Sequence, residues 1–400
     1  MECSNRKGQF PLIYLTIRGL KTIRLWNESP GQSLSTWGLI IIVIYPFVWL
    51  IPSWLFIMSS QDDLIRLVKA VNEQIVFLVI FYKLCAFAMN FRRWEQLFYD
   101  LQRAYSSVMK KPNMDIQGVL GHVENATYCL TKWYCSVLIF NCALYGSFPM
   151  LFVVVKYALT GSYDMPLSTP VEANYFIPGY RTNFWIWLPL DFMLNALLEL
   201  HGIALFLIEC FTWSLIHATS CLFRILQIQA NELSVQHEHE HIFSAKLTSF
   251  VTLHDSVLRS AQTLEEILSV QMLIIYLSTV LALCLMTIVL SWAFQDVYLL
   301  TTMICVIGYC LFQTFSFSYL GTELIEESGT VAEAIFHNTW YNQDVKMQKD
   351  LCFVLMRAKK PVRLTTGKLF IVTRDSFSQV IKQAYTIFTL MSQFLEDTDS

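Results

Sequence analysis

Six polar residues recur with helical spacing close to the end of the chain. They lie in the segment RDSFSQVIKQAYTIFTLMSQ (residues 374–393), where successive members are separated alternately by four and three positions. This spacing places them on one face of an α-helix. We call this face the polar stripe; it consists of Asp375, Gln379, Lys382, Thr386, Thr389 and Gln393. A row of polar side chains along a membrane-sized helix is suited to carrying ions through water.

The polar stripe needs either protein or water as its neighbour. About 20 residues cross a bilayer, and polar groups that face hydrocarbon are costly. One interpretation buries the stripe between helices of a single chain, where Asp375 and Lys382 would each need a partner. The other places several copies of the helix around a water-filled axis, and we favour it. An apolar ring at the outer end could then close the pore by dewetting. The predicted pore residues are Gln379, Lys382, Thr386, Leu390, Gln393 and Phe394.

A second set of residues favours the binding of a small apolar ligand. Aromatic side chains gather in the outer halves of three predicted spans, and such a group can line a pocket with few polar atoms. The alternative is that these residues form ordinary interfacial belts and packing contacts. The set comprises Tyr145, Phe148, Phe152, Trp185, Trp187, Phe192 and Tyr298. Asp191, Glu199 and His201 in the fourth span are further candidates, for ligand contact or for pairing with a neighbouring helix.

Other patterns in the sequence do not predict a catalytic, phosphate-binding or metal site. The run His237 to His241 (HEHEH) could bind a metal if extended, but we interpret it as a solvated loop. Residues 364–369 (LTTGKL) resemble the end of a phosphate loop, yet Val362 occupies the position that needs glycine. No serine has nucleophile-elbow glycines around it. We therefore predict no enzyme, no cofactor and no metal. The net charge of −3 and the lack of a basic stripe exclude nucleic acid as a partner.

The composition predicts an all-α integral membrane protein. Hydrophobic residues make up 55% of the 400 residues and charged ones only 15%, against about 25% charged in soluble domains. Seven spans are predicted, at about residues 37–58, 64–89, 133–159, 184 to past 217, 270–292, 297–319 and 370–394. Segments 219–268 and 321–369 have helical patterns and should form an intracellular layer, whereas 161–183 should form an ordered irregular loop.

The distribution of Lys and Arg predicts a cytoplasmic N-terminus and an extracellular C-terminus. Residues 1–35 carry five basic residues and no signal-peptide pattern. No cysteine lies in the predicted outer loops, so no extracellular disulfide is expected. The predicted division is a cytoplasmic segment (1–35), a six-helix bundle with an outer-half pocket (36–320), a cytoplasmic anchor (321–369), a pore-lining helix (370–395) and an extracellular tail (396–400).

Three motifs in the last third resemble the C-terminal signature of insect odorant receptors. They are VAEAIFHNTWYNQD (331–344), VLMRAKKPVRLTTGK (354–368) and SFSQVIKQAYTIFTLM (376–391), in that order and spacing. The resemblance implies an odorant-gated, non-selective cation channel in which a ligand-selective subunit assembles with a shared co-receptor, as a tetramer in the plasma membrane of olfactory neuron dendrites. It places Leu390, Gln393 and Phe394 at the outer gate, where Phe394 departs from the co-receptor's smaller aliphatic residue.

The same resemblance implies an odorant pocket between the second, third, fourth and sixth spans. The second span would contribute Val71 and Ile75, beside Tyr145, Phe148, Phe152, Trp187, Phe192 and Tyr298. The short 219–268 segment is similar to that of a ligand-selective subunit. A gustatory-type receptor channel is the nearest alternative. A G-protein-coupled receptor is less favoured, because no Asp-Arg-Tyr ends the third span and 338–341 lacks the proline of an Asn-Pro-x-x-Tyr motif.

Overall fold

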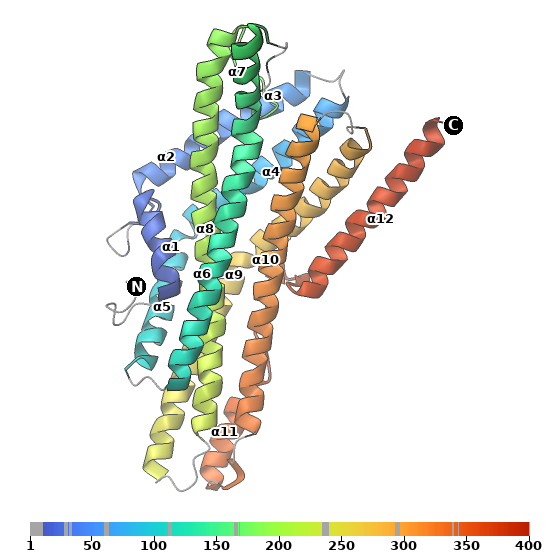
Figure 1. The fold of residues 1–400 in the computed structure, drawn as a ribbon. Helices are drawn as coiled ribbons and strands as arrows, with labels where there is room; N and C mark the ends of the chain where they lie inside the picture. Colours follow the sequence, from blue (N-terminus) through green and yellow to red (C-terminus); the bar gives the residue numbers. More distant parts are fainter. Residues whose placement is uncertain are drawn as a thin grey trace.

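Long helices form almost the whole of the structure, a computed structural model (Figure 1). It describes residues 11–27, 31, 34–59, 64–110, 114–163, 167, 169–233, 240–292, 297–337, 340–342 and 344–399. The α-helices are α1 (Pro11–Thr22), α2 (Thr36–Tyr45), α3 (Ile51–Ser59), α4 (Leu64–Met89), α5 (Phe91–Val108), α6 (Met114–Cys142), α7 (Phe148–Thr160), α8 (Phe184–Glu232), α9 (Glu240–Trp292), α10 (Val297–Phe336), α11 (Val345–Ala358) and α12 (Arg374–Asp399).

Short irregular helices and two strands complete the fold. They are the π-helical turns η2 (Pro46–Leu50) and η3 (Ala143–Ser147), the 3-10 turn η4 (Trp340–Asn342), and strands β1 (Thr365–Thr366) and β2 (Phe370–Ile371). Each π turn joins two α-helices into one longer rod: η2 connects α2 to α3, and η3 connects α6 to α7. Pro46 and Pro149 lie at these breaks, as expected of residues that cannot donate a helical hydrogen bond.

Three helices are much longer than a membrane is thick. At about 1.5 Å per residue, the 49 residues of α8 span about 74 Å, whereas the hydrocarbon core of a bilayer is about 30 Å. The helices α8, α9 and α10 therefore continue past the membrane, and Figure 1 shows their lower parts side by side with α11. This arrangement matches the helical layer predicted for 219–268 and for the first part of 321–369.

Hydropathy and length identify five membrane spans among the described residues. They are Thr36–Ser59, Ile65–Met89, Phe184–Glu232, Phe243–Met286 and Met303–Phe336. They coincide with the first, second, fourth, fifth and sixth predicted spans. In the predicted third span the apolar part is the shorter stretch Leu144–Thr160. The helix α12, the predicted seventh span, is not among them because the polar stripe lowers its hydropathy.

Three expectations about the last part of the chain differ from the structure. Residues 359–373 are not helical; they contain β1 and β2, which pair antiparallel. Gly367 and Lys368 at the turn have φ of 58° and 61°, a left-handed conformation that ends regular helix. The last helix begins at Arg374 rather than near 370, since Thr373 and Ser376 exchange capping hydrogen bonds of 2.9 and 3.2 Å. It also continues to Asp399, through the predicted tail.

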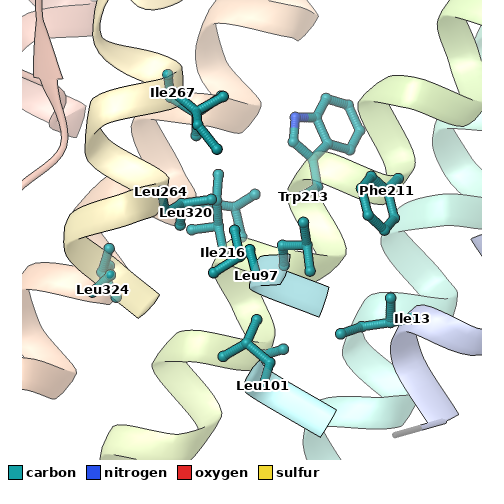
Figure 2. Packing of buried hydrophobic residues seen from close by; sticks show 14 of the residues in the cluster. Ile13, Leu97, Leu101, Phe211, Trp213, Ile216, Leu264, Ile267, Leu320 and Leu324 are labelled. Atoms are coloured by element: carbon teal, nitrogen blue, oxygen red, sulfur yellow. The ribbon is translucent and has the colours of Figure 1, made fainter. Parts of the chain in front are cut away.

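The core is organised around α8. All residues from 208 to 223 are buried, so this part of the helix has neighbours on every side. Figure 2 shows Phe211, Trp213 and Ile216 of α8 surrounded by side chains from α1, α5, α9 and α10. The helix α5, which the sequence analysis did not predict, contributes Leu97 and Leu101.

A buried ion pair fixes four helices relative to one another. Lys83 Nζ of α4 lies 2.8 Å from Glu209 Oε1 of α8, and neither side chain is exposed. Tyr134 of α6 donates to Glu209 Oε2, and Gln313 of α10 donates to Glu209 Oε1. A buried charge is tolerable only when it is paired and hydrogen-bonded. The cluster Lys83–Tyr134–Glu209–Gln313, hereafter the inner cluster, therefore sets the register of α4, α6, α8 and α10.

Removing one charge of the inner cluster should destabilise the protein strongly. We expect Lys83→Met or Glu209→Gln to lower the free energy of unfolding by about 3–5 kcal/mol, because the remaining charge is left buried without its partner. The double variant should lose less than the sum of the two single losses. Thermal unfolding of the detergent-solubilised protein measures these differences. Equal melting temperatures for wild type and both single variants would contradict the structural role of the pair.

Candidate ligand cavity and pore helix

A cavity of about 110 Å³ lies between five helical segments above the inner cluster. Its walls are almost entirely aromatic and aliphatic. The lining residues are Tyr45, Trp49, Val76, Phe77, Ile80, Asn141, Tyr145, Leu198, His201, Gly202, Leu205, Val306 and Tyr309. They come from α2 and η2, α4, α6 and η3, α8, and α10, so both π turns border the cavity.

The first span supplies the aromatic wall. Tyr45 and Trp49 are four residues apart across the start of η2 and are both buried. The Trp49 ring stacks on Phe77 at 5.5 Å, and the Tyr45 ring meets His201 edge-on at 4.9 Å. The Tyr45 hydroxyl is buried and has no hydrogen-bond partner among the residues that the structure describes. The wall therefore offers flat apolar faces and one unused hydroxyl group.

Two tyrosines connect the cavity to buried carboxylates. Tyr145 donates from its hydroxyl to Glu73 Oε1 at 2.8 Å, and Tyr309 reaches Glu209 Oε1 of the inner cluster at 3.5 Å. Gln313 Nε2 also donates to the Tyr309 hydroxyl, at 3.0 Å. Both rings line the cavity while both hydroxyls are held in charged clusters. Displacement of either ring would therefore disturb a buried ion-pair network.

Glu73 also ties the loop 169–183 to the bundle. Its Oε2 accepts from the backbone N–H of Glu172 at 2.9 Å, and Lys69 Nζ lies 3.7 Å from Glu73 Oε1 and 3.5 Å from Glu172 Oε1. Arg181 lies 3.6 Å from Glu172 and donates to the Ala173 carbonyl at 2.8 Å. These contacts hold the described part of the loop against the bundle; this part has no regular secondary structure, as the sequence predicted.

Of the predicted ligand-binding residues, Tyr145 lines the cavity. Trp187 is buried in a separate cluster with Leu167 and Phe184, and Phe152 and Phe192 are exposed on the outside of the bundle. Val71 and Ile75 are half-buried on α4 and are not part of the cavity wall. The side chains of Phe148 and Tyr298 lie outside the described residues.

Sequence reasoning missed most of the cavity wall. Tyr45 and Trp49 were hidden because the first span is apolar on every side, so periodicity does not distinguish its inner face. Lys83 and Glu209 were detectable, since each is a charge within a long apolar segment. His201, a candidate from the fourth span, lines the cavity. Asp191 is not part of the lining; its Oδ2 accepts a hydrogen bond from Asn195 Nδ2 at 3.0 Å.

The polar stripe faces away from its own chain. Val380 and Ala384 are the buried side of α12 against α9 and α10, while Gln379, Lys382, Thr386, Leu390 and Gln393 are all exposed. The side chain of Phe394 lies outside the described residues. In Figure 1, α12 leaves the bundle and stands apart from it towards the C-terminus. The stripe is thus not a seam buried between helices in the described part of this chain.

No group of three or more His, Cys, Asp or Glu within the described ranges could hold a metal ion. His237 of the HEHEH run lies outside these ranges, and the side chain of His241 is not described either.

The sequence is similar to odorant receptors in every match described here. A family model described as 7tm Odorant receptor matches residues 63–385. Odorant receptor 45a of Drosophila melanogaster is 23% identical over 394 residues, which cover 94% of this chain and 97% of that protein. Putative odorant receptor 85e of Drosophila melanogaster is 24% identical over 38% of this chain, and Odorant receptor Or2 of Anopheles gambiae is 25% identical over 44%. These two matches span 32% and 49% of the relatives' own lengths.

The fold is similar to that of a solved insect receptor. The olfactory receptor OR5 from Machilis hrabei, determined alone and in complex with eugenol, superposes with a TM-score of 0.81 over 96% of this chain and 97% of that one, at 14% identity. Such a low identity establishes the fold alone. The family match, in contrast, covers most of the chain. The chain therefore belongs to the insect 7tm odorant receptor family and is an all-α integral membrane protein with seven transmembrane helices.

Proposed function

We propose that this odorant receptor is the odorant-binding subunit of a ligand-gated, non-selective cation channel. In this proposal it assembles with the shared co-receptor as a tetramer in the plasma membrane of olfactory neuron dendrites, with its N-terminus in the cytoplasm. The observation that carries the proposal is the exposed polar stripe of α12. Family membership favours this reading over a gustatory-type channel.

The argument from α12 is one of solvation. A transmembrane helix cannot leave charged and amide side chains in hydrocarbon, and the described part of its own chain does not cover them. Apolar residues beside the stripe, such as Ile381 and Tyr385, are exposed as well. Equivalent helices from neighbouring subunits could cover the apolar flanks and enclose water along the stripe. A pore formed by several chains meets both requirements.

The cavity fits a small odorant. An apolar cavity of about 150 Å³ is large enough to bind benzene, so a cavity of about 110 Å³ suits a compact molecule or one that displaces a side chain slightly. Leaving a hydroxyl buried without a partner is costly. A ligand with a hydrogen-bond acceptor would satisfy Tyr45, so we infer that small odorants with one oxygen acceptor bind best.

The helix α10 provides a physical connection from the cavity to the pore helix. Tyr309 lines the cavity near one end of α10, and Thr322 further along accepts from the backbone N–H of Arg374, the first residue of α12, at 2.9 Å. A Cβ at Gly321 would lie 2.5 Å from the Val372 carbonyl, so α10 and the chain entering α12 are in close contact. Movement of Tyr309 on odorant binding would be transmitted along α10 to the start of α12.

Current recording tests the channel proposal. The chain and the co-receptor are expressed together in a cell that lacks both, and whole-cell current is recorded during odorant application with G-protein signalling blocked. A rapid cation current that persists under the block supports a channel. Loss of the response under the block would favour G-protein coupling, and current that is identical without this chain would exclude a ligand-selective role.

Filling the cavity should desensitise the receptor. We expect Ile80→Trp to raise the half-activating odorant concentration about tenfold or more, because overpacking costs about 1–3 kcal/mol. Leu78→Trp is the matched control, since Leu78 lies on the same helix but is exposed on the outside of the bundle. Dose–response curves at equal surface expression measure the difference. Equal shifts in both variants would show that the odorant binds elsewhere.

The unpartnered hydroxyl gives a prediction about ligand chemistry. Tyr45→Phe should raise the half-activating concentration of an acceptor-bearing odorant about tenfold, which is about 1.4 kcal/mol and the size of one hydrogen bond. A hydrocarbon of the same shape should be unaffected. The comparison requires dose–response curves for both ligands on wild type and variant. Parallel losses for the two ligands would indicate a packing defect rather than a lost hydrogen bond.

Lys382 gives a prediction about permeation. We expect Lys382→Glu to increase the permeability to divalent cations relative to monovalent ones, because acidic rings attract cations into a pore. Lys382→Gln removes the positive charge alone and should have an intermediate effect. Reversal potentials in solutions of different divalent content measure the change. Unchanged reversal potentials in both variants would place Lys382 away from the conduction path.

A further inference from the structure

A second hollow lies on the other side of the inner cluster from the odorant cavity. It is a groove of about 480 Å³ between α6, α8 and α10. None of its lining residues also lines the odorant cavity. We call it the lower groove. Its lining includes His122, Trp133, His217, Arg224, Phe315 and Glu323.

The lining of the lower groove changes from polar to apolar along α6 and α10. On α6, His122 lies at one end and Trp133 at the other; on α10, Glu323 and Phe315 occupy the corresponding ends. Arg224 of α8 joins the polar end, because it lies 3.6 Å from Glu323. Because α6 runs antiparallel to α8 and α10, the chain runs towards the polar end in α10 and away from it in α6. The shared change from polar to apolar is therefore not a simple change of composition along the sequence. The groove has the polarity of an amphiphile with a small polar head.

The charges at the polar end disfavour an anionic head. Arg224 is shared between two carboxylates, with Nη2 at 3.6 Å from Glu323 and Nε at 2.6 Å from Glu327. His217 Nε2 lies 3.2 Å from Glu323, and its Nδ1 contacts the Thr127 hydroxyl. Arg374, which lies over the Tyr319 ring, is paired with Glu326 at 3.9 Å, so three carboxylates face two guanidinium groups and leave this end short of positive charge. A phosphate head would be repelled, whereas an uncharged hydroxyl can donate to a carboxylate.

The apolar end lies on the outer surface of the bundle. Trp133 is 67% exposed and Phe315 is 46% exposed, and both belong to the lining of the lower groove. Phe312, also in the lining, adds a further ring, one face of which stacks on Tyr134 at 5.5 Å. Exposed aromatic rings around a groove in a membrane protein offer a surface for a rigid, planar, apolar body.

We propose that the lower groove binds a membrane sterol. The sterol hydroxyl lies at the polar end and donates to Glu323, and the fused rings pack against Phe312, Phe315 and Trp133. A rigid ring system loses little conformational entropy on binding, and its single neutral polar group matches the carboxylate-rich end. The bound sterol packs on α6 and α10, on the opposite side of the inner cluster from the odorant.

Photolabelling tests this proposal without relying on channel activity. A diazirine-bearing cholesterol is added to membranes that contain the full chain together with the co-receptor, and labelled peptides are mapped by mass spectrometry. We expect label on α6 and α10, competition by unlabelled cholesterol, and little competition by phosphatidylcholine. Ala126→Trp, which fills the groove, should lose most of this label. Ala196→Trp is the matched control, because Ala196 is an exposed alanine on α8 outside the groove.

Three outcomes would overturn the proposal. Equal labelling of the two variants would show that sterol contacts the surface without using the groove. Equal competition by phosphatidylcholine would indicate a general acyl-chain site. Label that appears only when the co-receptor is omitted would show that a neighbouring subunit covers the groove. Size-exclusion profiles of both variants confirm that they are folded.

Discussion

The fully buried carboxylate of Glu209 and ammonium of Lys83 limit how the surrounding helices can pack. Desolvating these charges is affordable only because Tyr134 and Gln313 donate to the carboxylate from two further helices. Sliding α6 or α10 by one turn would remove a donor and leave a lone pair of a buried carboxylate unsatisfied. The position of the odorant cavity is a consequence, since Tyr309 can reach Glu209 only with its ring in the cavity wall.

The helices α8 and α12 differ in burial: the middle of α8 is enclosed, whereas most described side chains of α12 are exposed. The middle of α8 is buried on all sides, so it provides a fixed reference for the bundle. The helix α12 is held over its first three turns, where Arg374 N–H donates to Thr322, Ser376 lies 3.3 Å from the Tyr276 hydroxyl, and Val380 and Ala384 are buried. Beyond Ala384 no described side chain of α12 is buried, so this part of the helix can tilt without disturbing the core. That freedom suits the pore role that we propose for α12.

The sequence revealed the parts of this protein that depend on composition and on short-range spacing. Long apolar runs located five spans, and the alternation of three and four positions identified the polar face of α12. It did not reveal what depends on the rotation of one helix against another. Trp187 and Tyr45 are both buried aromatics in spans, yet only Tyr45 lines the cavity. The β-hairpin was missed because its turn depends on two left-handed residues, Gly367 and Lys368, within a polar segment.

The inner cluster also lies between the apolar cavity and the lower groove. The Tyr134 ring stacks on Phe312 of the lower groove at 5.5 Å, while its hydroxyl donates to Glu209. Tyr309, three residues before Phe312 on α10, borders the odorant cavity. Between the rings of Phe312 and Tyr309 lies a charged, hydrogen-bonded layer. An apolar molecule can cross this layer only by displacing the partners of a buried ion pair. A sterol in the lower groove, as we propose, would be separated from the cavity by the same contacts that fix the helices.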